Sequence, residues 1–233
     1  MAAVARNRFY LTIALTLAIV VFVGFSPTYY LRAFFDQPPL TRLVHLHGLV
    51  FSAWLLLFVA QTRFIAVHNV RAHMKLGIAG AVLAIIVVIV GVATAIASLS
   101  SPRPHSLGMT SQQFLAIPLT GITLFAGFVA TAIALRRRAA LHKRFMVLAM
   151  IAVLGPPIAR LLAFTHTREL FLIVQTAVPA VFVIWCLLND WIRYRIVHPV
   201  FALGGMLIVL SWPLRVMLGK SDLWVSIVQS MTG

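Results

Sequence analysis

Eight histidines are the residues of this sequence best suited to chemistry, and most of them stand where an apolar run begins or ends. Three follow basic residues in similar short segments: Arg71-Ala-His73, Arg138-Ala-Ala-Leu-His142 and Arg195-Ile-Val-His198. One imidazole from each of two facing helices can ligate a b-type haem, and three can bind zinc or copper. The sequence therefore offers His73 with His142, near Arg138, as a haem pair, and His73, His142 and His198 as a metal site.

A second group of polar residues surrounds His47, which shares one helical face with Phe51, Trp54, Phe58 and Gln61. His47 and His166, beside Arg160, form an alternative haem pair. Pro156-Pro157 precedes Arg160 and should break the helix, which would leave carbonyl oxygens near its guanidinium. His47 and Gln61 would also suit a quinone headgroup, and histidine chains can relay protons. We expect His47 and Arg160 to share one polar pocket.

Histidines at helix ends also have a purely structural interpretation, because a polar tip is inexpensive at the level of the lipid headgroups. No catalytic residue stands out. The chain has four acidic residues, so carboxylate acid–base catalysis has few candidates: Asp36, Glu169, Asp190 and Asp222. Motifs for phosphate binding, nucleophilic catalysis or a zinc protease do not occur. These observations favour a protein without enzymatic activity.

Composition places these residues in a membrane. Hydrophobic residues make up 62% of the 233 residues and charged residues 10%, whereas soluble domains are about 45–50% apolar and about 25% charged. The net charge of +15 comes from basic residues in short gaps between apolar runs. Such a distribution offers no contiguous basic face to nucleic acid and fits a lipid bilayer.

Seven apolar stretches are long enough to cross the hydrocarbon, which needs about 20 residues of helix. They cover residues 9–27, 43–60, 76–97, 114–135, 145–164, 170–188 and 200–218. Pro213 should end or kink the last of them. Residues 221–233 carry apolar side chains at helical spacing and predict a short amphipathic helix in the membrane interface.

The basic residues also predict the orientation of these spans. Twelve Lys and Arg fall on the side of the N-terminus and seven on the other side, so we expect a cytoplasmic N-terminus in a bacterial inner membrane. The three segments with His73, His142 and His198 resemble one another and suggest a repeated hairpin. The prediction is an all-α, polytopic membrane helix bundle over residues 1–233, with one leading helix followed by three hairpins.

Two motifs resemble a group of uncharacterised bacterial membrane proteins. The first is His45-Leu-His47-Gly48, then Trp54, Gln61 and His73-Met-Lys-Leu-Gly77; the second is His142-Lys-Arg-Phe-Met146 followed by Arg160. The match covers residues 43–165, and Met74 stands where those proteins usually carry Arg. The pattern is also loosely similar to cytochrome-oxidase assembly membrane proteins and small di-haem b-type cytochromes. The resemblance implies an inner-membrane protein linked to haem or respiration.

Two functions follow as expectations. The first is a haem- or metal-binding membrane protein, with haem b as the cofactor, that serves respiratory electron transfer or oxidase assembly. The alternative is a non-catalytic accessory or scaffolding subunit, which would associate with other membrane protein subunits. A small transporter is a weaker third interpretation, because the chain has few acidic residues for coupling to ions.

Overall fold

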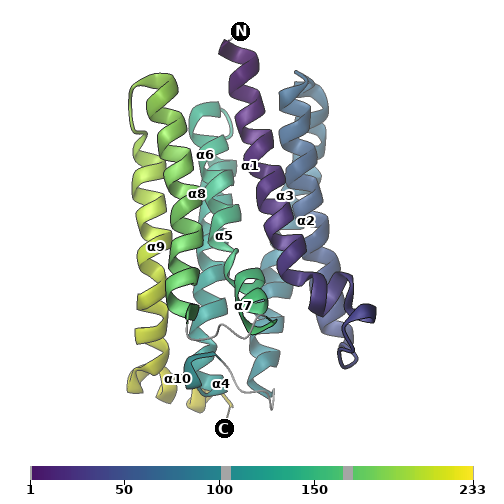
Figure 1. The fold of residues 1–233 in the computed structure, drawn as a ribbon, viewed down its shortest axis with the longest axis vertical. Helices are drawn as coiled ribbons and strands as arrows, with labels where there is room; N and C mark the ends of the chain where they lie inside the picture. The colour runs from purple at the N-terminus through teal and green to yellow at the C-terminus, as the bar shows by residue number, and fades with distance from the viewer. Residues whose placement is uncertain (1, 101–105, 165–169, 233) are drawn as a thin grey trace. The chain divides into compact units, whose positions relative to one another are not determined.

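A computed structural model describes residues 2–100, 106–164 and 170–232 (Figure 1). The described residues form helices and no strands. Seven helical segments are long and apolar enough to cross a membrane: Arg8–Tyr30, Arg42–Ala66, Val70–Ser100, Ser111–Ala134, Ala139–Ala163, Phe171–Tyr194 and Pro199–Lys220. The predicted all-α, polytopic membrane helix bundle is therefore confirmed.

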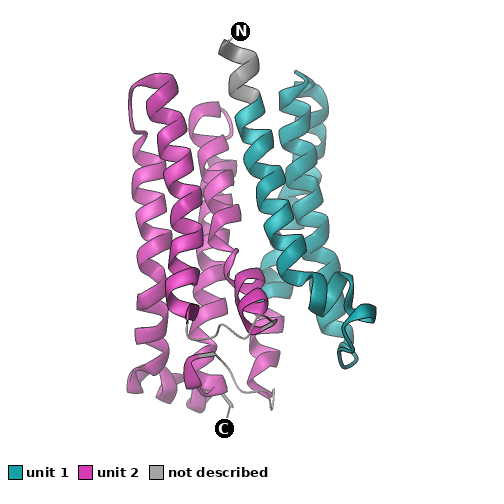
Figure 2. Ribbon diagram, in the orientation of Figure 1, with its two compact units in different colours: residues 1–91 teal, residues 92–233 magenta. Residues whose placement is uncertain are grey.

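The chain divides into two compact units, residues 1–91 and residues 92–233 (Figure 2). We call them unit 1 and unit 2 and describe each by itself. The two units are distinguished by the contacts within each of them. The expectation of a single domain over residues 1–233 stays a prediction.

Unit 1 is built on the pair α1 (Ala2–Phe25) and α2 (Arg42–Ala66), with the beginning of α3 (Val70–Ala97). A π-helical turn, Ser26–Tyr30, ends α1 and turns two tyrosines toward α2. The Tyr30 hydroxyl lies 2.8 Å from Ser52 Oγ, and the Tyr29 hydroxyl donates to the carbonyl of His45. Thr41 caps α2 by accepting from the amide of Val44. These contacts set the start of the helix that carries His47.

Unit 2 contains α4 (Ser111–Phe114), α5 (Ala116–Ala134), α6 (Ala139–Ala152), α7 (Gly155–Phe164), α8 (Phe171–Tyr194), α9 (Pro199–Lys220) and α10 (Asp222–Thr232). Helix α9 packs against α4, α5, α6, α8 and α10. Gly205 allows α9 to approach α8 closely, because a Cβ at this position would collide with Val183 of α8. Close helix contact at small residues is the usual means of association in a bilayer.

The two proline sites behave differently. Helix α6 ends at Ala152 and α7 begins at Gly155, so Pro156 and Pro157 divide this span as predicted. The helix does not end at Pro213, because α9 continues through it to Lys220; the alternative, a kink at Pro213, stays a prediction. A proline inside a transmembrane helix is tolerated when neighbouring helices, side chains and small backbone adjustments satisfy the freed backbone groups, and α9 has neighbours along its length.

The C-terminal segment forms a helix, α10, with two different faces. Trp224 donates from Nε1 to the carbonyl of Gln112 at 2.9 Å, and Val228 is buried against Ala95 and Leu115. Leu223 and Met231 are exposed on the opposite side. One face of α10 therefore packs on unit 2, while the interfacial position of its exposed face stays a prediction.

Candidate functional site

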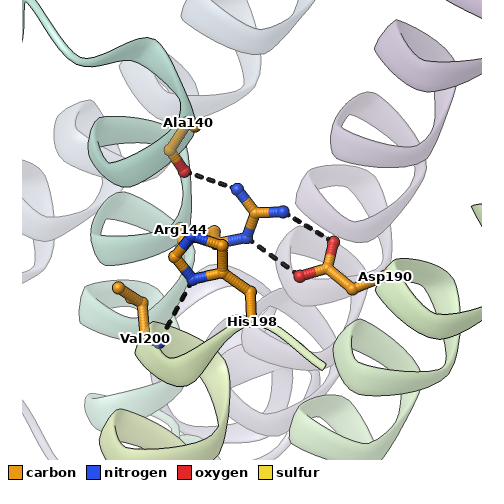
Figure 3. A network of polar contacts seen from close by, with 5 residues as sticks. All are labelled: Ala140, Arg144, Asp190, His198 and Val200. Atoms are coloured by element: carbon orange, nitrogen blue, oxygen red, sulfur yellow. Dashed lines mark hydrogen bonds and ion pairs between the residues drawn. The ribbon is translucent and has the colours of Figure 1, made fainter. Parts of the chain in front are cut away.

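A buried ion pair joins α6 to α8 at one end of unit 2 (Figure 3). Arg144 donates from Nε and Nη2 to the two carboxylate oxygens of Asp190, each at 2.9 Å. Nη1 donates to the carbonyl of Ala140. Arg144 is 3% exposed and Asp190 is fully buried. This forked geometry satisfies both charges together, which is the condition for keeping them inside the protein.

His198 lies beside this pair and begins α9 as its N-cap residue (Figure 3). Its Nδ1 accepts from the amide of Val200 at 3.2 Å, so the neutral ring carries its proton on Nε2. Burial lowers the pKa of His198 below its usual value, and the positive charges of Arg144 and Lys143 lower it further, against an opposing effect of Asp190. The fold therefore favours a neutral imidazole whose Nε2 is a donor.

His142 has the opposite arrangement. Its Nδ1 lies 2.8 Å from the carbonyl of Ala132, on the preceding helix α5. A carbonyl oxygen only accepts, so Nδ1 carries the proton, and Nε2 is the basic nitrogen of the neutral ring. A histidine that ligates a metal almost always donates its other ring N–H to a carbonyl or carboxylate in this way. Of these two histidines, His142 is thus the one oriented as a ligand.

The predicted hairpin repeat places two histidines alike and the third differently. His73 and His142 are each the fourth residue of a helix, and each amide donates to the carbonyl four residues earlier, at Asn69 and Arg138. His198 instead precedes the first residue of α9. His198 differs in its place relative to the helix start, because Pro199 occupies the first position of α9; the equivalence of the three histidines in a repeated hairpin stays a prediction.

In unit 1 the stripe that begins at His47 faces the interior. Trp54 and Phe58 are 4% and 5% exposed, and the Nδ1 atom of His47 is buried. The His47 ring stacks on Phe51 with 4.1 Å between ring centroids. At the far end of the stripe, Gln61 approaches the glycine face of α3 at Gly77. Trp54 and Phe58 are therefore buried within unit 1, and His47 and Gln61 at the two ends of the stripe are partly buried.

Arg160 lies on α7, one turn after the proline break. Its Nη1 donates to the carbonyl of Pro156 at 3.3 Å, so a carbonyl at the break does serve the guanidinium as predicted. Arg160 belongs to unit 2 and His47 to unit 1, so their shared pocket stays a prediction. His166, the other member of that proposed haem pair, lies outside the described residues.

Each predicted ligand set that includes His73 spans both units, since His73 is in unit 1 and His142 and His198 are in unit 2. The haem pair and the three-histidine metal site therefore stay predictions. Among the residues that the structure describes, no three His, Cys, Asp or Glu side chains within either unit are grouped to hold a metal ion.

A second polar cluster, which sequence reasoning missed, lies toward the other end of α9. Arg215 is 2% exposed; it donates from Nη2 to Ser211 Oγ at 2.9 Å, and its guanidinium carbon lies 4.6 Å from the centre of the Trp212 ring. Nearby, fully buried Gln175 of α8 donates to the carbonyl of Gly155 at 2.9 Å. This hydrogen bond ties the start of α7 to α8.

The ion pair was also missed, although the sequence contains a signal for it. Asp190 is an acidic residue directly after the apolar run 170–188, and a carboxylate so close to a membrane span needs a cation near it. Arg144 had been counted only among the basic residues that set topology. Its role as the partner of Asp190 required knowing that α6 and α8 pack together.

Comparisons with family models, with curated proteins and with solved structures find no match to this chain. The functional argument therefore depends on the geometry described above.

Proposed function

We propose that this chain is a haem-binding protein of the bacterial inner membrane that serves respiratory electron transfer or oxidase assembly, and that His142 would hold haem b. The observation that carries the proposal is the hydrogen bond from His142 Nδ1 to the Ala132 carbonyl. This bond fixes the orientation and the tautomer of the ring, so that Nε2 is the nitrogen with which His142 would hold iron.

His73, the second ligand expected from the sequence, occupies the same position in α3 as His142 does in α6, but it belongs to the other unit, so the proposal is argued from His142. Both residues are partly buried near a helix end. Exposed Arg136, Arg137 and Arg138 precede α6 and would pair with the haem propionates. The bound haem would supply one-electron chemistry, and the protein would hold and orient it. No catalytic residue is assigned.

The proposed orientation places the N-terminus and the 136–144 segment in the cytoplasm. It is supported by the excess of Lys and Arg on that side of the seven spans. The haem would then lie near the cytoplasmic surface, within reach of other membrane subunits of a respiratory complex.

An optical spectrum of the protein, purified from membranes supplied with haem, tests this function. We expect a Soret band that is lost in His142→Ala and retained in His198→Ala, because the Nδ1 of His198 is already engaged as a cap. His142→Met should retain haem and raise its reduction potential, since a thioether is also an axial ligand. A structural role for His142 would affect the Ala and Met variants equally.

Two results would overturn the proposal. One is a wild-type protein without a Soret band and without stoichiometric metal, which would leave the alternative of a non-catalytic accessory or scaffolding subunit. The other is equal haem loss in the His142 and His198 variants, which would show that the ring orientation at His142 has no bearing on ligation.

A further inference from the structure

A long apolar groove runs along the outward surface of unit 2 between α5 and α9. It has a volume of about 480 Å³ and is lined on α9 by Leu203, Met206, Leu210 and Leu214, and on α5 by Thr120 and Leu124. The four α9 side chains are 51–62% exposed, which places them toward lipid. Arg215 and Ser211 also line the groove, so a cation borders an otherwise apolar surface.

The charge of Arg215 has no protein counterpart among the described residues of unit 2. The buried carboxylate there, Asp190, is already bound at both oxygens by Arg144. Arg215 forms one hydrogen bond to a neutral hydroxyl, and its buried Nε has no acceptor in the described structure. A guanidinium at membrane depth normally pairs with an anion or with water. An anion that enters through the groove would complete this site.

The dimensions of the groove indicate the rest of that ligand. Arg215 lies five residues before the end of α9 at Lys220, which is about 7.5 Å along the helix. The apolar lining extends from Leu203 to Leu218, which is about 22 Å. One leaflet of the hydrocarbon is about 15 Å thick. Arg215 near the end of α9 would therefore contact a charged headgroup, and the apolar lining, which is as long as one leaflet, would contact the acyl chain that follows it.

We propose that this groove binds one anionic phospholipid, with its phosphate on Arg215 and an acyl chain along α9. Planar guanidinium groups bind phosphate oxygens in pairs, which favours Arg at such a site. The proposal is independent of haem binding, because the groove contains none of the histidines assigned to haem.

Native mass spectrometry of the full chain in detergent, titrated with phosphatidylglycerol, tests the headgroup contact. We expect Arg215→Gln to weaken binding by about tenfold, the effect of losing a charge-assisted hydrogen bond. Lys220→Gln removes the same charge from an exposed position on the same helix and should leave binding unchanged. Phosphatidylcholine, which has no net charge, should bind more weakly than phosphatidylglycerol.

A second pair of variants tests the acyl chain and does not depend on Arg215. Leu210→Trp fills the groove from an exposed position and should weaken phosphatidylglycerol binding. Leu188→Trp, at an exposed leucine of α8 outside the groove, should not. If Arg215→Gln fails to fold, the phosphatidylglycerol binding of Leu210→Trp and Leu188→Trp is sufficient to test the proposal.

Three outcomes would overturn the proposal. They are wild-type affinity in Arg215→Gln, equal effects of Leu210→Trp and Leu188→Trp, and binding of oleate as tight as that of phosphatidylglycerol. The last would identify a free fatty acid as the ligand instead of a phospholipid.

Discussion

Removing the carboxylate of Asp190 should destabilise the protein strongly, because it leaves Arg144 charged and buried. The carboxylate receives two hydrogen bonds of 2.9 Å from a guanidinium that is 3% exposed. A hydrogen bond to a charged group contributes about 1.5–3 kcal/mol, and breaking a buried ion pair costs about 3–5 kcal/mol. We expect Asp190→Leu to lower the free energy of unfolding by about 3–5 kcal/mol.

The double variant Arg144→Leu/Asp190→Leu should recover most of this loss. Two apolar residues of suitable volume replace a buried pair at little or no cost, and the exchange often stabilises by about 1–4 kcal/mol. Here the gain is reduced, because Arg144 also lies 5.6 Å from the Phe201 ring centre, a contact worth about 0.5–2 kcal/mol. The double variant should therefore fall within about 2 kcal/mol of wild type.

The assay is reversible unfolding in mixed micelles, measured for wild type, both single variants and the double variant. Arg193→Leu, at an exposed cation of the same helix end, is the matched control and should change stability little. Equal losses in Asp190→Leu and in the double variant would refute the reasoning, since the damage would then come from packing and not from an unpaired charge.

Three further predictions concern other parts of the chain. Folding lowers the pKa of His198, so the unfolded chain binds a proton at this residue more readily than the folded chain does. The stability of the fold should therefore decrease as the pH drops below about 6.5. The variant His198→Asn keeps a capping side chain that does not titrate, and thermal unfolding should show that this pH dependence is lost. In the variant Arg137→Cys, the new thiol should react with a membrane-impermeant reagent only from the cytoplasmic side, whereas native Cys186 is fully buried and should stay unreactive. Labelling of residue 137 from outside would reverse the topology. Gly205→Ala should lower the free energy of unfolding by about 1–3 kcal/mol, because the added Cβ overpacks against α8. Gly127→Ala is the control and should not lower it, because a Cβ there would meet no described atom within 4 Å. Equal effects of the two variants in an unfolding assay would contradict the close contact between α8 and α9.

The transmembrane helices were predictable because the hydrocarbon imposes a minimum length of apolar residues, but their ends were not. The span predicted from residue 145 begins at Ala139 in α6, and the span predicted to end at residue 188 continues to Tyr194 in α8. Hydropathy registers only the part of a helix inside the hydrocarbon. Both helices continue past these apolar runs through turns that carry charged residues, and Arg144 and Asp190 lie in those turns.

The site was less predictable, because its decisive features are contacts between helices. The sequence singled out His142 and His198 as similar residues. The carbonyl of Ala132 and the amide of Val200 distinguish them, and both depend on where a helix begins or ends. The break near Arg160 was foreseen from two adjacent prolines, since a missing N–H is a local property. Arg215 is one of the seven basic residues on the other side in the sequence, and its burial depends on helix packing that the sequence does not show.

The ion pair also has a consequence for the synthesis of this protein. Asp190 follows Arg144 by 46 residues, so the ribosome completes α6 before the partner of Arg144 exists. A charged residue deep in a bilayer costs about 2.5–3.5 kcal/mol on insertion scales. We therefore expect the start of α6 to remain among the headgroups during translation and to settle only when α8 enters the membrane. In a nascent chain that is interrupted before residue 190, Arg144 would lack the carboxylate of Asp190. An incomplete product would therefore differ from the finished protein in carrying an unpaired cation at the start of α6.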